Sequence, residues 1–436
     1  MAKPLPILLL VVALLAGGCG GDDEPVDPDD ATGSPETTGT VADNGVSARL
    51  ECEEPVTVGV VTDLTGGLSI YGTQLERSVA IGLAYASGSA VAAGPAQTYQ
   101  VDDCEIRVVF GDDQTNPEVA ELVARRLIAE EGAGVLIGSA GAGTTAALRE
   151  VAADTDVILV ATTDTPTGLT EADFHENVFL LALSQAQHAY ATCGYFAAAL
   201  GAQSFAQIAP DFPAGHRAAA SYRAACESTG GDFVGPDRML PTGTTDFSST
   251  VAELAEDDPD ALLLTWSGAG IGSLLTEVAE AFPADTAFGV TFAPDAVLPL
   301  FFDVAAGWTS PTTYHYTSPS TDANDYLVET LAAVGATPDQ YDALGMDAAL
   351  LVVAALRVVN GSSDVEALRT ALEGVESAGP KGRLTVRPSD HLIIQDTYIV
   401  ELLNTDDPSN QFFDTVATIR PEPPCLLEGE ATARCS

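Results

Sequence analysis

Basic side chains are scarce in this chain of 436 residues. It carries 17 lysines and arginines against 63 aspartates and glutamates, so its formal net charge is −46. Binding to nucleic acid depends on clustered lysines and arginines that contact the phosphates. The composition therefore excludes nucleic acid as a partner. Because the acidic residues are spread along the chain, we expect them to form a solvated surface that keeps the protein soluble.

The motifs of common catalytic and cofactor sites are absent as well. The sequence contains no G-x-x-x-x-G-K-[ST], H-E-x-x-H or G-x-S-x-G motif, and its five histidines have no recurrent spacing. No cysteine or histidine spacing typical of a metal site occurs. Gly268, Gly270 and Ser273 approximate a dinucleotide-binding turn, but the third glycine and the later acidic residue are missing. We therefore predict no enzyme, no cofactor and no metal.

The N-terminus lacks an apolar run long enough to cross a bilayer, because its longest run covers only residues 5–15. This run follows Lys3 and leads into three small residues, which is the pattern of a secretory signal over residues 1–18. The small residues before Cys19 resemble a bacterial lipoprotein signal, in which the cysteine becomes the lipidated first residue of the mature chain. An ordinary cleaved signal is the alternative. Residues 19–50 have almost no large apolar side chains, so we predict a disordered acidic tether.

Six cysteines remain if Cys19 carries lipid, and an even number in an exported chain favours disulfides. The number of cysteines alone leaves many pairings open. Each neighbouring pair flanks one local structural unit. We therefore predict three local disulfides, Cys52 with Cys104, Cys193 with Cys226, and Cys425 with Cys435.

Apolar strands alternate with helices along the folded region. The sequence predicts strands at 56–61, 106–110, 134–137, 157–160 and 178–181, and the pattern then starts again with strands at 205–209, 261–266 and 287–290. Strands that alternate with helices at this spacing indicate βαβ units and parallel sheets. The chain is therefore predicted to be an α/β protein with two such lobes.

Two polar loops follow neighbouring strands of the first lobe. A loop of small residues at 138–143 leads into a helix at Thr144, and residues 161–166 form a second loop rich in threonine. Ligands of open parallel sheets lie at these carboxyl ends of strands. A helix start also offers N–H groups without partners, which suits a carboxylate or a similar small anion. The alternative is that the glycines only allow tight turns.

Several short motifs follow one another between residues 55 and 403. They are Gly59–Thr62 with Leu64, Thr65, Gly66, Tyr71 and Gly72; Asp112, Asp113 and Pro117; Ile137 and Gly138; Leu169 and Thr170; Pro294 and Asp295; the helix around 341–356; and Gly382, Asp390 and His391. In this order they resemble the branched-chain amino-acid binding family of ABC-transporter receptors, the type I periplasmic binding proteins.

This resemblance implies an α/β fold of two doubly wound lobes with parallel sheets, joined by a three-segment hinge. It implies that the first lobe consists of residues 55–182 and 311–384. The second lobe would consist of residues 183–306 and 385–436.

The resemblance also implies a ligand site between the lobes. It places the ligand's carboxylate near Ala142, Gly143, Thr144, Thr163 and Thr165, an aromatic wall at Tyr71 and Trp266, and the partner of the ligand's ammonium at Asp295. The chain departs from the family at Asp164, where alanine is usual, and at Ala214–Gly215, where Tyr-Gly is usual and Phe212 lies nearby. Alternative interpretations are core aromatics for Tyr71 and Trp266, a helix N-cap for Asp295 and an Asx turn for Asp164.

The function implied is that of an extracytoplasmic, monomeric solute-binding lipoprotein. It would be anchored to the cell membrane by lipid on Cys19 and deliver an amino acid or a similar small polar solute to the permease of an ABC importer. A ligand-sensing receptor module of the same fold is the alternative. The ligand stays open among branched-chain amino acids, other amino acids, amide or urea-like compounds and aromatic acids.

Overall fold

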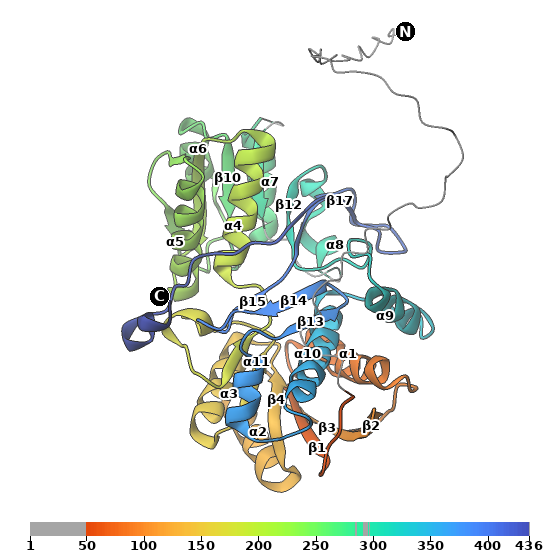
Figure 1. Cartoon of the computed structure of the whole chain (residues 1–436). Helices are drawn as coiled ribbons and strands as arrows, with labels where there is room; N and C mark the ends of the chain where they lie inside the picture. Colours follow the sequence, from red (N-terminus) through yellow and green to blue (C-terminus); the bar gives the residue numbers. More distant parts are fainter. Residues whose placement is uncertain (1–48, 284–285, 291–294, 296, 436) are drawn as a thin grey trace, which may run out of the picture. The chain divides into compact units, whose positions relative to one another are not determined.

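The computed structural model describes residues 49–283, 286–290, 295 and 297–435 (Figure 1). The predicted signal, Cys19 and most of the predicted tether lie outside the described residues. Residues 291–294, which follow the predicted strand at 287–290, also lie outside them.

The first sheet has six strands in the order β2-β3-β1-β4-β5-β6. Its strands are β1 (Val56–Thr62), β2 (Ala96–Val101), β3 (Cys104–Asp112), β4 (Ala133–Gly138), β5 (Ile158–Ala161) and β6 (Val178–Leu180). All neighbours are parallel except β2, which pairs antiparallel with β3 at the edge. Strand β2 is absent from the predicted strands. Its buried and exposed residues alternate, so it lacks the continuous apolar run that marks the parallel strands.

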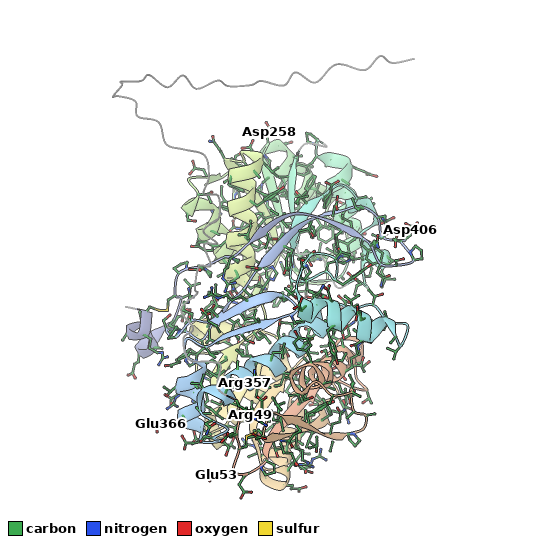
Figure 2. The ribbon with its side chains drawn as sticks, turned by 45° about the vertical axis from the view of Figure 1, so that its right-hand side comes forward. Arg49, Glu53, Asp258, Arg357, Glu366 and Asp406 are labelled. Atoms are coloured by element: carbon green, nitrogen blue, oxygen red, sulfur yellow. A yellow bond between two sulfur atoms is a disulfide. The ribbon has the colours of Figure 1, made fainter. Side chains whose placement is uncertain are left out.

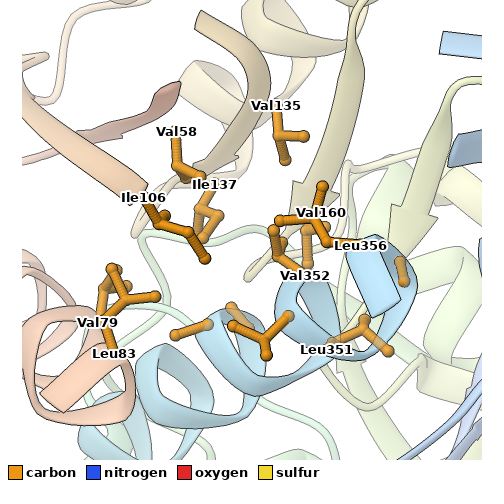
Figure 3. Packing of buried hydrophobic residues seen from close by; sticks show 14 of the residues in the cluster. Val58, Val79, Leu83, Ile106, Val135, Ile137, Val160, Leu351, Val352 and Leu356 are labelled. Carbon is orange, nitrogen blue, oxygen red and sulfur yellow. The ribbon is translucent and has the colours of Figure 1, made fainter. Parts of the chain in front are cut away.

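The helices of the first lobe lie against this sheet, except α9 (Asp322–Ala332), which packs on α1 (Ser69–Ser87) and α10 (Gln340–Val358). The other helices are α2 (Pro117–Glu131), α3 (Ala142–Thr155) and α11 (Val365–Leu372), with a π-helical turn at Gly168–Ala172. Helix α2 begins at Pro117, because Asn116 caps it and a proline suits its first turn. Figure 3 shows Val79 of α1 and Val352 of α10 packed against Ile106 and Ile137 of the sheet. Segments far apart in sequence therefore share one core.

The second sheet is parallel and has the order β11-β10-β7-β8, with β9 also paired to β7. Its strands are β7 (Ser204–Pro210), β8 (Asp232–Phe233), β9 (Arg238–Leu240), β10 (Ala261–Leu264) and β11 (Ala287–Val290). The accompanying helices are α4 (Gln185–Tyr195), α5 (Pro213–Ser228), α6 (Ser248–Glu256), α7 (Ile271–Ala281) and α8 (Leu298–Phe301), with short helical turns at Phe196–Leu200 and Asp303–Ala305. The predicted α/β fold with two lobes is confirmed.

Two small antiparallel sheets complete the described chain, in the orders β12-β16-β17 and β13-β14-β15. Their strands are β12 (Thr309–Thr312), β13 (Glu376–Gly379), β14 (Gly382–Val386), β15 (Ile393–Ile394), β16 (Thr397–Leu402) and β17 (Phe413–Ile419), and a 3-10 helix at Gly429–Cys435 follows. The chain passes between the two lobes after β6, after β12 and between β15 and β16 (Figure 1).

The six cysteines of the described region form the three predicted disulfides. They join Cys52 to Cys104, Cys193 to Cys226, and Cys425 to Cys435. Each disulfide therefore joins neighbouring segments within one lobe or within the C-terminal region, which is the local pairing that the sequence predicts. Across residues 49–435, apart from the short gaps, no helix has both the length and the apolar character needed to span a membrane.

Many acidic side chains lie on the outside of the molecule, although several aspartates, among them Asp342 and Asp347, are buried. Figure 2 shows Asp258, Glu366 and Asp406 projecting from the surface, and all of them are exposed. Solvated carboxylates of this kind repel one another and other acidic surfaces, so they favour solubility.

Candidate functional site

Two adjoining cavities lie at the carboxyl ends of strands from both parallel sheets. The first, with a volume of about 570 Å³, is here called the aromatic cavity. It is lined by Tyr71, Gln185, His188, Phe212, Ala214, Gly215, Ala218, Leu264, Thr265, Trp266, Ser267, Gly268, Ile271, Val290, Val297, Phe301 and Phe302. Apolar and aromatic side chains dominate this lining, which therefore suits an apolar group of a ligand.

The second cavity, of about 380 Å³, is here called the polar cavity. It is lined by Ala142, Thr162, Thr163, Asp164, Thr165, Pro166, Ala182, Leu183, Gln185, His188, Phe212, Ala214, Arg217, Thr313, Gln340, Tyr341 and Leu344. Four residues line both cavities, namely Gln185, His188, Phe212 and Ala214. The site is therefore continuous, with a polar and an apolar part. This is the location that the ends of parallel strands predict.

The threonine-rich loop after β5 lies on the polar cavity, as the sequence predicts. The Thr163 hydroxyl lies 3.0 Å from the Tyr341 hydroxyl, which donates a hydrogen bond to the Ala140 carbonyl at 3.2 Å. The Thr165 hydroxyl donates to Asp173 at 2.5 Å, and its side chain is nearly fully buried. Thr163 is thus the more accessible of the two predicted hydroxyls.

The predicted helix-start residues divide between the cavity and the interior. Ala142 lines the polar cavity, whereas Gly143 is exposed and is not among the residues described above that line either cavity. Thr144 is buried, and its hydroxyl donates to the Gly141 carbonyl at 2.9 Å and lies 2.7 Å from the Ser139 hydroxyl. The expectation that the Thr144 hydroxyl meets the ligand is therefore corrected, because this hydroxyl holds the loop together from behind.

The predicted aromatic residues do line the aromatic cavity, and they are also part of the packing. Tyr71 stacks on Tyr341 with ring centroids 5.2 Å apart. Trp266 packs edge-on against Phe247 at 5.1 Å, and its ring nitrogen donates to the Ala269 carbonyl at 2.9 Å. The core and the binding-site interpretations of these residues are therefore compatible, because a rigid aromatic wall needs support from behind.

Asp164 does not form the expected Asx turn, because the residue two positions on is Pro166, which has no N–H group; it binds other N–H groups of its loop and pairs with a cation. Its carboxylate accepts hydrogen bonds from the N–H groups of Thr165 at 2.9 Å and Leu169 at 2.8 Å. The other oxygen accepts from Arg217 of α5 at 2.9 Å. Arg217 is not among the predicted site residues, because its partner Asp164 lies 53 residues away and no pattern near Arg217 in the sequence indicates the pairing.

Arg217 holds the loop of residues 164–171 against the second lobe. Besides Asp164, it contacts Glu171 at 3.4 Å and donates to the Thr165 carbonyl at 3.0 Å. The side chains of Arg217, Asp164 and Glu171, here called the ion cluster, are each 12% exposed. Gly168 makes room for it, because a Cβ there would lie 2.3 Å from an Arg217 nitrogen, and its φ of +92° also disfavours other residues.

Asp295 is buried, but it lies in neither cavity lining as described. Burial, and then the nearby Asp339 carboxylate, raise its pKa to about 8, so it holds a proton at neutral pH. Its neighbour His315 lies 3.9 Å away. Burial lowers the pKa of His315 to about 4, and its ring contacts the Asn410 carbonyl and the Thr317 hydroxyl. Because the imidazole is neutral, His315 does not act as a cation beside the carboxyl of Asp295.

No cluster of three or more histidine, cysteine or acidic side chains suited to a metal ion occurs in the described residues. The cavities therefore offer hydrogen bonds, aromatic surface and one arginine rather than metal ligands.

Comparisons with known proteins agree with this geometry. Residues 55–407 match the family model described as periplasmic binding protein, and no curated protein matches the chain. The fold is similar to an ABC-type branched-chain amino acid transporter protein from Rhodopseudomonas palustris, with a TM-score of 0.75 and 24% identity over 86% of this chain and 100% of that chain.

Two further solved structures come from ABC transporters of R. palustris. One is a solute binding protein in complex with benzoate, with a TM-score of 0.63 and 20% identity over 84% of this chain and 97% of that chain. The other is a solute binding protein in complex with 4-hydroxybenzoate, with a TM-score of 0.68 and 18% identity over 85% of this chain and 98% of that chain. At these identities the similarity concerns the fold.

Proposed function

Because the chain belongs to the periplasmic binding protein family, we propose that it is the receptor of an ABC importer for an amino acid or a similar small solute that carries a carboxylate. Members of this family are extracytoplasmic, bind small molecules and work with an importer permease without catalysis. The observation that carries the proposal for the ligand is the pair of adjoining cavities, which combines hydroxyls after β5 with an aromatic wall.

An aromatic acid is the second candidate ligand, and one observation favours it. Among the lining residues described, the only acidic side chain is Asp164, and Arg217 already pairs with it. The aromatic cavity has no carboxylate for a ligand's ammonium group, whereas its rings suit an aromatic body. Similar folds occur in proteins of both kinds, namely a branched-chain amino acid transporter protein and a solute binding protein in complex with benzoate.

The test is to identify what the purified protein carries. The protein is purified without denaturation, and native mass spectrometry then detects any co-purified small molecule. Calorimetry with the identified compound, with leucine and phenylalanine, and with benzoate and its 4-hydroxy derivative would follow. We expect micromolar or tighter binding of at least one of these acids. Failure to bind any amino acid or aromatic acid would contradict the proposed ligand class.

A ligand-sensing module of the same fold is the alternative function. It would bind the same ligand and differ in the protein that reads the closed state. Pull-down of an importer permease by the ligand-loaded protein separates the two, because a sensing module would not retain a permease.

We also propose that the chain is attached to the membrane by lipid on Cys19. The support is the signal-like N-terminus, with small residues directly before the cysteine. A single acyl chain binds membranes only marginally, so stable attachment requires the multiple chains of a lipoprotein. Cys19→Ala is therefore expected to move the protein from the membrane fraction to the soluble fraction, as measured by cell fractionation.

The matched control for this prediction is Ser34→Ala in the predicted tether, which should leave the protein with the membranes. If Cys19→Ala still sediments with membranes after a high-salt wash, the attachment has another origin and the lipid anchor is wrong.

A further inference from the structure

His188 lies where the two cavities meet. It belongs to the first turn of α4, and it lines both the aromatic and the polar cavity. The start of this helix is fixed by reciprocal hydrogen bonds between Ser184 and Gln187, and Gln187 also donates to the Ile393 carbonyl at 3.0 Å. The imidazole is therefore held by a rigid element at the junction of the site.

One ring nitrogen of His188 has no hydrogen-bond partner in the part of the protein that the structure describes. The side chain is 9% exposed, and its Nδ1 atom is buried without a hydrogen-bond partner among the described residues. Buried polar atoms in proteins nearly always have a partner, and an exception at a cavity indicates a missing ligand or water. Burial, and then the charge of Lys381, lower the pKa of His188 to about 4. The ring is therefore neutral at physiological pH.

A neutral imidazole carries one donor and one acceptor nitrogen, and the hydrogen bond of one nitrogen fixes the role of the other. Because Nδ1 of His188 has no protein partner in the described chain, the protein does not fix the tautomer. The ring can therefore donate to a ligand oxygen or accept from a ligand hydroxyl or amine. This adaptability distinguishes it from Arg217, which only donates.

The two parts of the site impose a shape on the ligand. Hydroxyls and Arg217 surround the polar cavity, whereas Trp266, Phe301 and Phe302 belong to the aromatic cavity. A solute that occupies both cavities lies against the four residues that line both, and among these His188 has the unpartnered Nδ1 atom described above.

We propose that His188 is a specificity-determining residue that hydrogen-bonds a polar group in the middle of an amphipathic ligand, whose charged end lies in the polar cavity and whose apolar body lies in the aromatic cavity. The inference rests on the proposed function, because it assigns the ligand class of the same site.

The experiment compares probe pairs that differ by one hydroxyl group between the carboxylate and the ring, namely phenylalanine with 3-phenylserine and phenylacetate with mandelate. Calorimetry measures their affinities for the wild type, for His188→Phe, which keeps a ring and removes both nitrogens, and for His188→Gln, which keeps a donor and an acceptor. His216→Leu is the matched control, because His216 is exposed on α5 and lies in neither lining. Circular dichroism checks that each variant is folded.

We expect the wild type to prefer the hydroxylated member of at least one pair by about tenfold or more, the effect of one additional hydrogen bond. His188→Phe should lose this preference, whereas His188→Gln and His216→Leu should retain most of it. A merely structural role for His188 would change stability and leave the ratio of the two affinities unchanged.

The experiment distinguishes a failure of the role of His188 from a failure of the proposed function. Equal binding of both members of each pair by the wild type, or an unchanged preference in His188→Phe, overturns the role of His188 and leaves the proposed function intact. If the wild type binds none of the probes, the proposed ligand class fails, and the assignment of His188 fails with it.

Discussion

Replacing Asp295 with alanine is expected to weaken the binding of an amino acid by about two to four decades. The expectation rests on the ammonium-binding role that the family resemblance gives this residue. A buried ammonium group that loses its carboxylate costs about 3 to 5 kcal/mol, which corresponds to that loss of affinity. Calorimetry with the identified ligand is the measurement, and Asp295→Asn is the matched variant, because it keeps the shape and removes the charge.

The pKa of Asp295 adds a second observable to this prediction. With a pKa of about 8, the carboxyl of the ligand-free protein is mostly protonated at pH 7. An ammonium bound beside it would favour the ionised form, so binding should release about one proton, and affinity should rise as the pH rises towards 8. Calorimetry in buffers of different ionisation enthalpy measures this release. An aromatic acid without an ammonium group should release none.

The same raised pKa affects stability with a defined sign. Between the ordinary pKa of an aspartate and about 8, the folded protein binds a proton at Asp295 that the unfolded chain has lost. The stability of the ligand-free protein should therefore fall as the pH rises through this window, and Asp295→Asn should reduce that dependence. Unchanged amino-acid affinity in Asp295→Ala would mean that Asp295 is only a buried acid and does not bind the ammonium group of the ligand.

Removal of Arg217 is expected to destabilise the protein by about 3 to 5 kcal/mol, the typical cost of breaking a buried ion pair on one side. In Arg217→Met the carboxylates of Asp164 and Glu171 would remain at 12% exposure without their cation, while the apolar stem of the side chain is kept. The free energy of unfolding from denaturant titration measures the loss.

Arg223→Met on the same helix is the control for Arg217. Arg223 pairs with Asp237 and Glu227, but all of these side chains are 30% exposed or more. More exposed ion pairs contribute about 0 to 1 kcal/mol. If the two variants lose the same free energy of unfolding, the ion cluster stabilises the protein no more than an exposed ion pair does. Combining Arg217→Met with Asp164→Asn and Glu171→Gln should recover part of the loss, because no uncompensated charge is then left.

The sequence by itself determined the main strands of the two parallel sheets and the disulfides of this protein. Parallel strands covered on both faces are continuous apolar runs, so β1, β4 and β5 are visible without a structure. The disulfides follow for a related reason, because each joins cysteines that flank one local unit. The threonine-rich loop after β5 could be assigned to the site because the ends of parallel strands share one edge.

Only the tertiary structure decided which side chains line the two cavities. Thr144 and Thr163 are alike in sequence terms, but the rotation of α3 turns the first into a buried network and leaves the second on the polar cavity. His188 lies on α4 and Arg217 on α5, and both helices follow β6 and the first passage of the chain between the lobes. No local sequence pattern therefore relates them to the loop at 162–166. The raised pKa of Asp295 likewise depends on burial against Asp339, 44 positions along the chain. Periodicity reports the neighbours along the chain, whereas a binding site is made by contacts between distant segments, and these exist only once both lobes have packed.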